Sequence, residues 1–355
     1  MLPELCLGLA MLGVTAYAVL GSADFGAGFW DLTAGGARRG GRVRGMIQRS
    51  MSPVWEANHV WLIFVLVIVW TAFPVAFASI FSTLSIPLFL AALGIIFRGA
   101  AFALRGQAGT IREARALGAL FASSSVLIPF CLGTVAGAIA SGRVPVGNAA
   151  GDAWSSWLNP TSVLIGVLGI ITGAHLAAVF LSGDSRRADQ PDLVRAFRTR
   201  ALATGALAGV VALGGLLVLR SDARDLFDGL TSGAGLACVA VSALAGAATL
   251  ALVWTERYGT ARLTAAAAVG AITVGWALAQ RPYLLPGELT LDEAAAGDAT
   301  LAAVLVGLAI GALVLVPSLV LLYRLVLRGT LDQEFEPLDQ RFRPREASDA
   351  EGRKA

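Results

Sequence analysis

Apolar stretches of about twenty residues recur along almost the whole chain, separated by short breaks rich in Gly, Pro and Arg. An α-helix needs roughly twenty residues to cross the hydrocarbon core of a bilayer. Because these stretches are continuously apolar and lack the alternation of a β-barrel strand, helices are the only economical way to satisfy their backbone polar groups in lipid. The repetition therefore predicts an all-α, polytopic membrane protein with its helices packed in bundles.

Nine stretches are expected to cross the membrane. Their approximate boundaries are 5–24, 54–73, 76–103, 117–140, 160–182, 201–219, 233–254, 263–280 and 300–327. They form a transmembrane helical domain over residues 1–330, whereas residues 331–355 are charged and contain prolines. This second segment is predicted to be a cytoplasmic tail that stays disordered or lies on a partner. Composition agrees, because only 14% of the residues are charged and 56% are hydrophobic.

The placement of arginine predicts the direction of the chain in the membrane. Nine crossings put the two termini on opposite sides. If the N-terminus is outside, the outer loops keep four of the 27 basic residues, which are Arg143, Arg220, Arg224 and Arg281. The positive-inside rule therefore favours an N-out, C-in orientation. The basic residues are spread over loops and form no single patch with interleaved aromatics, so the lipid bilayer is the expected partner and nucleic acid is not.

Ionisable side chains inside the membrane are functional candidates, because inserting a charge there costs about 2.5–3.5 kcal/mol. Asp24 lies among glycines near the inner end of the first span. The second span begins at residues 52–61, Ser-Pro-Val-Trp-Glu-Ala-Asn-His-Val-Trp, where helical spacing puts Trp55 and Glu56 beside His59. One interpretation is a buried carboxylate with an adjustable pKa that passes protons inward from the cytoplasm. The alternative is a satisfied polar cap on a helix end.

The third span brings Arg98 to the membrane face where Asp24 and Glu56 are expected, so ion pairing among the three is predicted. The alternative for Arg98 is a snorkelling side chain at the interface. His59 and His175 lie on different spans and could in principle hold a haem, but interhelical hydrogen bonding is the more common role. The three cysteines have no metal-ligand spacing, and no metal site is predicted.

Five short motifs occur in a fixed order along the nine spans. They are Asp24-Phe25-Gly26-Ala27-Gly28, the run 53–62, Phe97-Arg98-Gly99, Pro282-Tyr283-Leu284 and Tyr323-Arg324. In this order they resemble subunit II of the bacterial cytochrome bd-type quinol oxidases. The most specific of them is the Pro-x-Trp-Glu-x-Asn-x-x-Trp-Leu pattern at the start of the second span.

The resemblance implies a non-haem subunit of a terminal respiratory oxidase in the bacterial cytoplasmic (inner) membrane. Such a complex takes electrons from quinol, reduces dioxygen to water and takes the protons from the cytoplasm. Haems of the b and d types are expected in the partner, the haem-bearing subunit I, and no cofactor is assigned to this chain. A structural quinone and a small single-helix subunit are left open.

The same resemblance implies roles for individual residues. Glu56 corresponds to an acidic residue at the cytoplasmic mouth of a proton path, and Asp24 to the carboxylate that supports it. The other motif residues are expected to position that acid or to line the subunit interface, and they are Trp55, Asn58, His59, Trp61 and Arg98. Some members of the family carry glutamine at the position of His59, which argues against a haem ligand there.

Two further functions are compatible with the residues. Inward-facing carboxylates in lipid also serve proton-coupled secondary transporters, although such a carrier should show helices broken by Gly or Pro at matching places in two halves. The sequence shows no convincing inverted repeat. The third possibility is a purely structural scaffold, in which no polar substitution would change turnover without also changing assembly.

Overall fold

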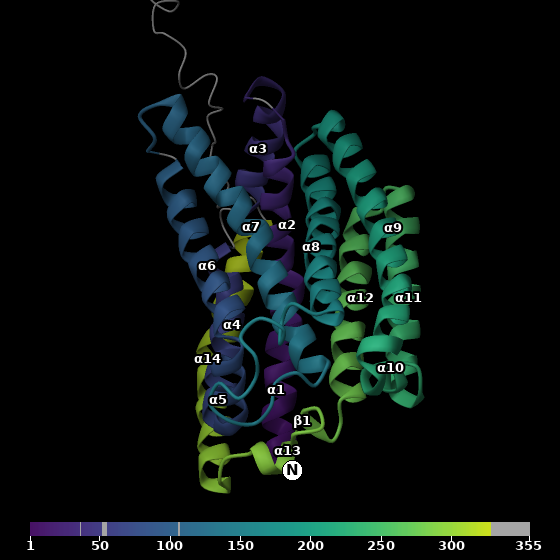
Figure 1. Ribbon diagram of the computed structural model, residues 1–355. Coiled ribbons are helices and arrows are strands. Elements are labelled where there is room, and N and C mark those ends of the chain that lie inside the picture. Colours follow the sequence, from purple (N-terminus) through teal and green to yellow (C-terminus); the bar gives the residue numbers. More distant parts are fainter. Residues whose placement is uncertain (36, 52–54, 106, 328–355) are drawn as a thin grey trace, which may run out of the picture.

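The computed structural model describes residues 1–35, 37–51, 55–105 and 107–327, and almost all of them are helical (Figure 1). The elements in chain order are α1 (Leu2–Ala16), η1 (Tyr17–Gly21), α2 (Ser22–Leu32), α3 (Ala37–Met51), α4 (Trp55–Ala72), α5 (Pro74–Thr83), α6 (Ser85–Arg105), α7 (Ile111–Ala140), α8 (Pro160–Arg187), α9 (Pro191–Asp222), α10 (Arg224–Leu230), α11 (Gly233–Trp254), α12 (Tyr258–Ala279), β1 (Tyr283–Leu285), β2 (Leu289–Thr290), α13 (Leu291–Ala294) and α14 (Asp298–Leu327). The charged tail predicted for 331–355 lies outside the described residues.

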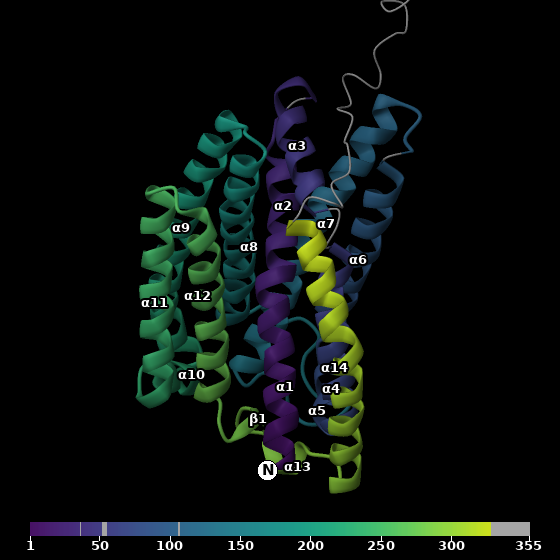
Figure 2. The ribbon, with the colours of Figure 1, turned by 180° about the vertical axis from the view of Figure 1, so that it is seen from behind.

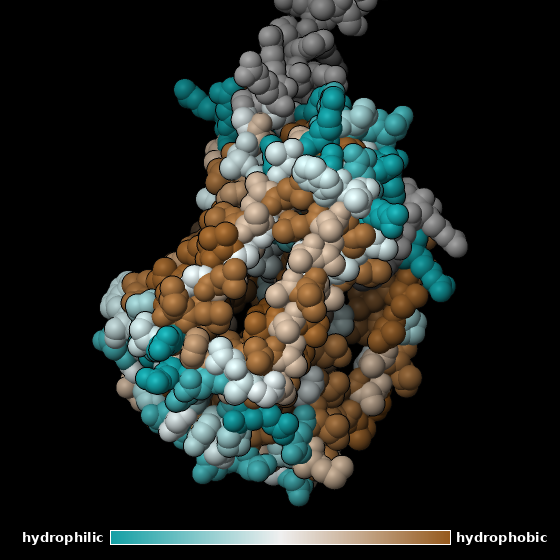
Figure 3. Space-filling model, turned by 90° about the vertical axis from the view of Figure 1, so that its right-hand side faces the viewer, coloured by the Kyte–Doolittle hydropathy of each residue, from teal (hydrophilic) through white to brown (hydrophobic). Residues whose placement is uncertain are grey.

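The described residues contain eight helices that are long and apolar enough to cross a membrane, and the bent pair of α4 and α5 raises the number to nine. The predicted all-α fold with about nine spans is therefore confirmed. An apolar band, brown in Figure 3, lies between two polar ends of the molecule. The N-terminus lies at one end of the bundle, and α14 runs from that end toward the other (Figures 1 and 2), as an odd number of crossings requires.

Several predicted spans have different boundaries in the structure, and two of these differences bear on the site. The first, expected at 5–24, continues to Leu32 because η1 and α2 extend α1 without a break. The third, expected at 76–103, is divided into α5 and α6, and α5 is bent by 119° from α4. Pro74 begins α5 after the non-helical backbone of Phe73. Proline lacks the N–H that would continue the preceding helix, so the chain restarts in a new direction.

Helix α3 occupies a segment that was expected to be an inner loop. It is rich in arginine, but Val43, Met46 and Ile47 recur at the spacing of one helix face and are buried in a core shared with α2 and α8. Its many charges lower the average hydropathy, so this segment does not resemble a membrane span in the sequence. The structure therefore places an amphipathic helix directly after the first span.

Helix α2 lies at the centre of the bundle, between α7 and α8 (Figures 1 and 2). A Cβ added to Gly26 would overlap the backbone of Gly173 on α8, and one added to Gly28 would overlap the side chain of Ser125 on α7. These glycines therefore allow both neighbours to approach closely. As a result, nearly the whole of α2 is buried, and its two aspartates are shielded from lipid.

Candidate functional site: two buried ion pairs on one helix

Asp24 of α2 is fully buried, and its charged partner is Arg98 of α6. The Arg98 Nη2 lies 3.0 Å from Asp24 Oδ1 and donates to the Asp24 carbonyl oxygen at 3.1 Å. The Nε of Arg98 donates to the hydroxyl of Ser125 on α7 at 3.0 Å. The guanidinium also lies over the rings of Phe25 and Phe121, 5.3 and 4.8 Å from their centroids. One arginine thus joins α2, α6 and α7.

The carboxylate of Asp24 has fewer hydrogen bonds than a buried carboxylate usually accepts. Neither of its oxygens accepts a directed hydrogen bond from the described residues, although Arg98 lies within ion-pair distance. The N–H groups of Arg98 point instead at the Asp24 carbonyl and at Ser125. Buried carboxylates usually accept several hydrogen bonds, so the oxygens of Asp24 can still accept further ones. The predicted pairing of Asp24 with Arg98 is observed, while its role in proton transfer stays a prediction.

A second buried carboxylate, Asp31, lies seven residues further along α2 and pairs with two arginines. Arg105 of α6 places Nη1 2.6 Å from Asp31 Oδ2. Arg44 of α3 places Nε 2.8 Å from Asp31 Oδ1. Arg105 follows Arg98 by the same seven residues, so the pairs repeat along α2 and α6 at an interval of about two helical turns.

Sequence reasoning missed the group formed by Asp31, Arg105 and Arg44. It ended the first span at residue 24 and the third at 103, so all three residues were assigned to loops. A usable signal existed, because residues seven apart lie on the same face of a helix, and the two aspartates and the two arginines share that spacing. The spacing becomes informative only when both helices are known to extend two turns further.

The motif at the start of α4 is described in part. The side chains of Trp55 and Glu56 lie outside the described residues, so their predicted closeness to Asp24 is untested. Asn58 is buried, and its side-chain amide donates to the Leu20 carbonyl of η1 at 3.3 Å. Asn58 therefore fastens the beginning of α4 to the middle of the first span.

Trp61, one turn further along α4, packs within this chain. Its ring meets the edge of Phe64 at a centroid distance of 6.0 Å. Its indole N–H is buried and has no hydrogen-bond partner among the described residues. The predicted interface role of Trp61 stays untested, because no partner chain is present.

The two histidines face different helices. His59 of α4 lies against η1, with its Nδ1 3.5 Å from the hydroxyl of Tyr17. His175 of α8 has its Nδ1 3.0 Å from the carbonyl oxygen of Ala201 on α9. These two contacts join the imidazoles to different helices, so they do not bring the two histidines together. Within the described residues, no three His, Cys, Asp or Glu side chains gather as metal ligands would.

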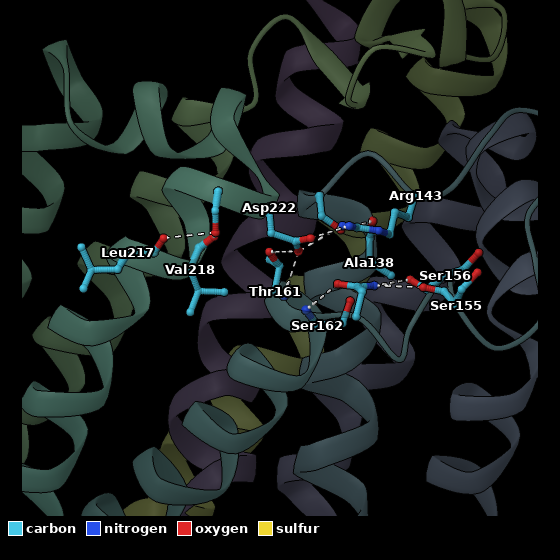
Figure 4. A network of polar contacts seen from close by, with 12 residues as sticks. Ala138, Arg143, Ser155, Ser156, Thr161, Ser162, Leu217, Val218 and Asp222 are labelled. Atoms are coloured by element: carbon cyan, nitrogen blue, oxygen red, sulfur yellow. Dashed lines mark hydrogen bonds and ion pairs between the residues drawn. The ribbon is translucent and has the colours of Figure 1, made fainter.

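A third polar network lies at the end of the bundle that holds the N-terminus (Figures 1 and 4). Asp222, the last residue of α9, accepts from the backbone N–H and the hydroxyl of Thr161 at 3.0 and 2.6 Å. Arg143 pairs with the same carboxylate at 2.6 Å. Thr161 lies in the first turn of α8, where a negative charge is favoured by the helix dipole. This network fastens α7, α8 and α9 together.

The fold and the site define a class: an all-helical, multi-pass membrane protein with carboxylate–arginine pairs buried at its centre. The family profile described as cytochrome bd terminal oxidase subunit II matches residues 2–326. The chain therefore belongs to this family, as its motifs predicted.

Known proteins of the same kind align with it. The solved structure of the bd oxidase from Geobacillus thermodenitrificans superposes with a TM-score of 0.72 and 26% identity, covering 92% of this chain and 98% of that chain. In Bacillus subtilis (strain 168), a protein provisionally named as a cytochrome bd menaquinol oxidase subunit II is 25% identical over 219 residues, 61% of this chain and 62% of that protein. The cytochrome bd ubiquinol oxidase subunit 2 of the same strain is 29% identical over 92 residues, 26% of this chain and 27% of that protein. The alignments thus span about three fifths and about a quarter of these two curated relatives.

Proposed function

We propose that this chain is the non-haem subunit of a bd-type quinol:oxygen oxidoreductase in a bacterial cytoplasmic membrane. Membership of the subunit II family and the likeness to a bd oxidase structure support this proposal. Its partner is the haem-bearing subunit I, whose haems supply the oxygen chemistry when bound there. A structural quinone and a small single-helix subunit are further expectations that come from the family resemblance. This chain contributes the helical frame on which the partner assembles and a route for protons.

Within that complex, Asp24 and Glu56 serve proton uptake from the cytoplasm. The observation that carries this role is the setting of Asp24, which is fully buried, has one arginine partner and accepts no directed hydrogen bond from the described residues. Arg98 keeps its bonds to Ser125 and to the Asp24 carbonyl whether or not the carboxyl is protonated. Asp24 can therefore change its protonation without releasing the contacts that hold the helices together.

The test uses the whole complex purified from its native membrane. We expect Asp24→Asn and Glu56→Gln to lower quinol-driven oxygen consumption about a hundredfold while the haem spectrum per complex is unchanged. Asp192→Asn is the matched control, because Asp192 is an exposed carboxylate whose side chain is 59% accessible. Unchanged turnover in both site variants would exclude the proton role.

Two other results would replace the proposal. If haem content falls in step with oxygen consumption in every site variant, the chain is a structural scaffold. If the purified chain alone moves protons with a solute in proteoliposomes, it is a secondary transporter. A co-purified larger partner that carries the haems is the result expected of an oxidase.

A further inference from the structure

Two polar side chains lie beyond Asp24, toward the centre of the membrane. Tyr17 stands at the middle of the continuous span Leu2–Leu32, seven residues before Asp24, which corresponds to about 10 Å along a helix axis. His59 of α4 faces Tyr17 across the helix pair. The uptake route described so far ends at Asp24 and uses neither of them.

The backbone at this level is specialised. Tyr17 begins η1, a five-residue π-helical segment inside an otherwise α-helical span. Such segments frequently mark functional positions in helices. The amide of Asn58 binds the Leu20 carbonyl within η1 and so fixes α4 against it. The ring of Tyr17 lies over Gly21, where an added Cβ would approach ring carbons to 2.8 Å, so the absence of a side chain at Gly21 gives the ring its place.

The rings of Tyr17, His59 and Phe25 form one cluster beside the first ion pair, and Tyr17 also meets Phe25 directly, at a centroid distance of 6.1 Å. The ring centroid of His59 is 6.1 Å from that of Tyr17 and 6.0 Å from that of Phe25, the neighbour of Asp24 in sequence. Phe25 in turn packs on the guanidinium of Arg98. Because Phe25 directly follows Asp24 on α2, the His59 ring lies near the first ion pair. Tyr17 and His59 therefore lie beside the residues of the first ion pair.

We propose that His59 and Tyr17 carry protons from Asp24 toward the centre of the membrane. The protonated Asp24 gives its proton to the imidazole of His59 after a side-chain movement, because neither Asp24 oxygen is hydrogen-bonded to a described residue at rest. The imidazolium then passes a proton from Nδ1 to the Tyr17 oxygen while the Tyr17 hydroxyl proton moves onward to the oxygen-reducing partner. Only O–H and N–H bonds change, both side chains return to their starting charge, and a shift of the ring proton back to Nδ1 prepares His59 for the next transfer. This inference rests on the proposed uptake at Asp24, which supplies the proton.

The geometry is compatible with transfer after a small movement. The Tyr17 oxygen and the His59 Nδ1 are 3.5 Å apart, so an approach of about half an ångström brings them to an ordinary hydrogen-bond length. Both side chains are only partly buried within this chain. On the proposed route, the proton leaves this partly exposed pair at mid-membrane depth for a neighbouring subunit.

The experiment measures the rate of proton uptake by the whole complex, with a pH-indicator dye, after reaction with dioxygen is started. Tyr17→Phe removes only the hydroxyl. His59→Gln keeps a hydrogen-bond acceptor but has no ring proton to pass on. Each is expected to slow uptake about tenfold or more, with haem content and the KM for quinol unchanged.

Matched controls remove the same groups elsewhere in the chain. Tyr258→Phe deletes a buried tyrosine hydroxyl at the start of α12, and His175→Gln replaces the histidine that contacts α9. Both are expected to take up protons at the wild-type rate. Slowing by the controls equal to that of the relay variants would overturn the specific role of Tyr17 and His59.

The outcomes separate this inference from the proposed function. If Asp24→Asn slows uptake and both Tyr17→Phe and His59→Gln do not, the relay is wrong and the uptake role of Asp24 stands. If none of the three slows uptake, the uptake role itself fails. The double variant of Asp24→Asn with Tyr17→Phe should be no slower than Asp24→Asn alone, and fully additive slowing would contradict one path in series.

Discussion

The two ion pairs on α2 share their chemistry and their spacing but differ in the number of arginines around the carboxylate. Asp31 is held from two sides, by Arg105 at 2.6 Å and by Arg44 at 2.8 Å. Among the described residues, Asp24 has one ion-pair partner, Arg98 at 3.0 Å, and that arginine directs its N–H groups at Ser125 and at the Asp24 carbonyl. Two carboxylates on one helix therefore have unequal freedom to change charge.

The difference indicates a division of roles. Protonation of Asp31 would leave two arginines at a buried site without their counter-charge, and uncompensated buried charges cost several kcal/mol. Asp31 is thus suited to fastening α2, α3 and α6. Protonation of Asp24 leaves one arginine, which keeps a hydroxyl and a carbonyl as partners. Asp24 is therefore the carboxylate that we propose exchanges protons.

The largest effect on stability is expected from Asp31→Asn. Loss of this anion leaves the buried Arg105 uncompensated and should lower the free energy of unfolding by about 3–5 kcal/mol. Denaturant unfolding of the purified protein in detergent measures this loss. Asp24→Asn should cost less, because it strands a single arginine, and Asp192→Asn should cost least, because the two ion pairs it removes are exposed to solvent. An equal loss for the Asp24 and Asp31 variants would contradict the comparison.

A smaller effect is expected from Gly28→Ala, which disturbs the first ion pair alone. The new methyl would overlap the side chain of Ser125 and push its hydroxyl away from Arg98. Overpacking of this kind costs about 1–3 kcal/mol, and oxygen consumption should fall with it. Gly8→Ala is the matched control, because a methyl at Gly8 of α1 meets nothing within 4 Å. If both variants behave alike, Ser125 does not support the pair.

The smallest effect is expected at Asp152, a carboxylate in the loop between α7 and α8 that is bound by backbone N–H groups. The backbone N–H groups of Ser155 and Trp154 donate to Asp152 and lower the pKa of that carboxyl below its ordinary value. Because the folded-state pKa is the lower one, the charge stabilises the loop above the unfolded-state pKa of about 3.9, and this contribution is lost as pH falls below it. Asp152→Asn should therefore lower the melting temperature slightly at neutral pH, and the difference should be lost as pH falls through the folded-state pKa. A difference that persists there would show a role independent of charge.

The span count and the partnership of Asp24 with Arg98 could be predicted because each depends on the cost of leaving polar groups in lipid. Twenty apolar residues must form a helix there, and a buried aspartate needs a cation nearby. The division at Pro74 could not be predicted with the same rule, because hydropathy is high on both sides of the break. Helix α3 was missed for the opposite reason, since its arginines conceal three buried apolar residues.

By itself, the sequence determined that Asp24 and Arg98 enter the membrane and that neither charge can stay alone there. Only the tertiary structure decided how many arginines each aspartate receives, because Arg44 arrives on a helix whose docking depends on its packing against α2 and α8. It also decided that Tyr17 meets His59, since that approach depends on the π-helical turn and on the register of α4 against it. The cost of a buried charge is local to each residue, whereas the choice of partner depends on how the helices extend and pack.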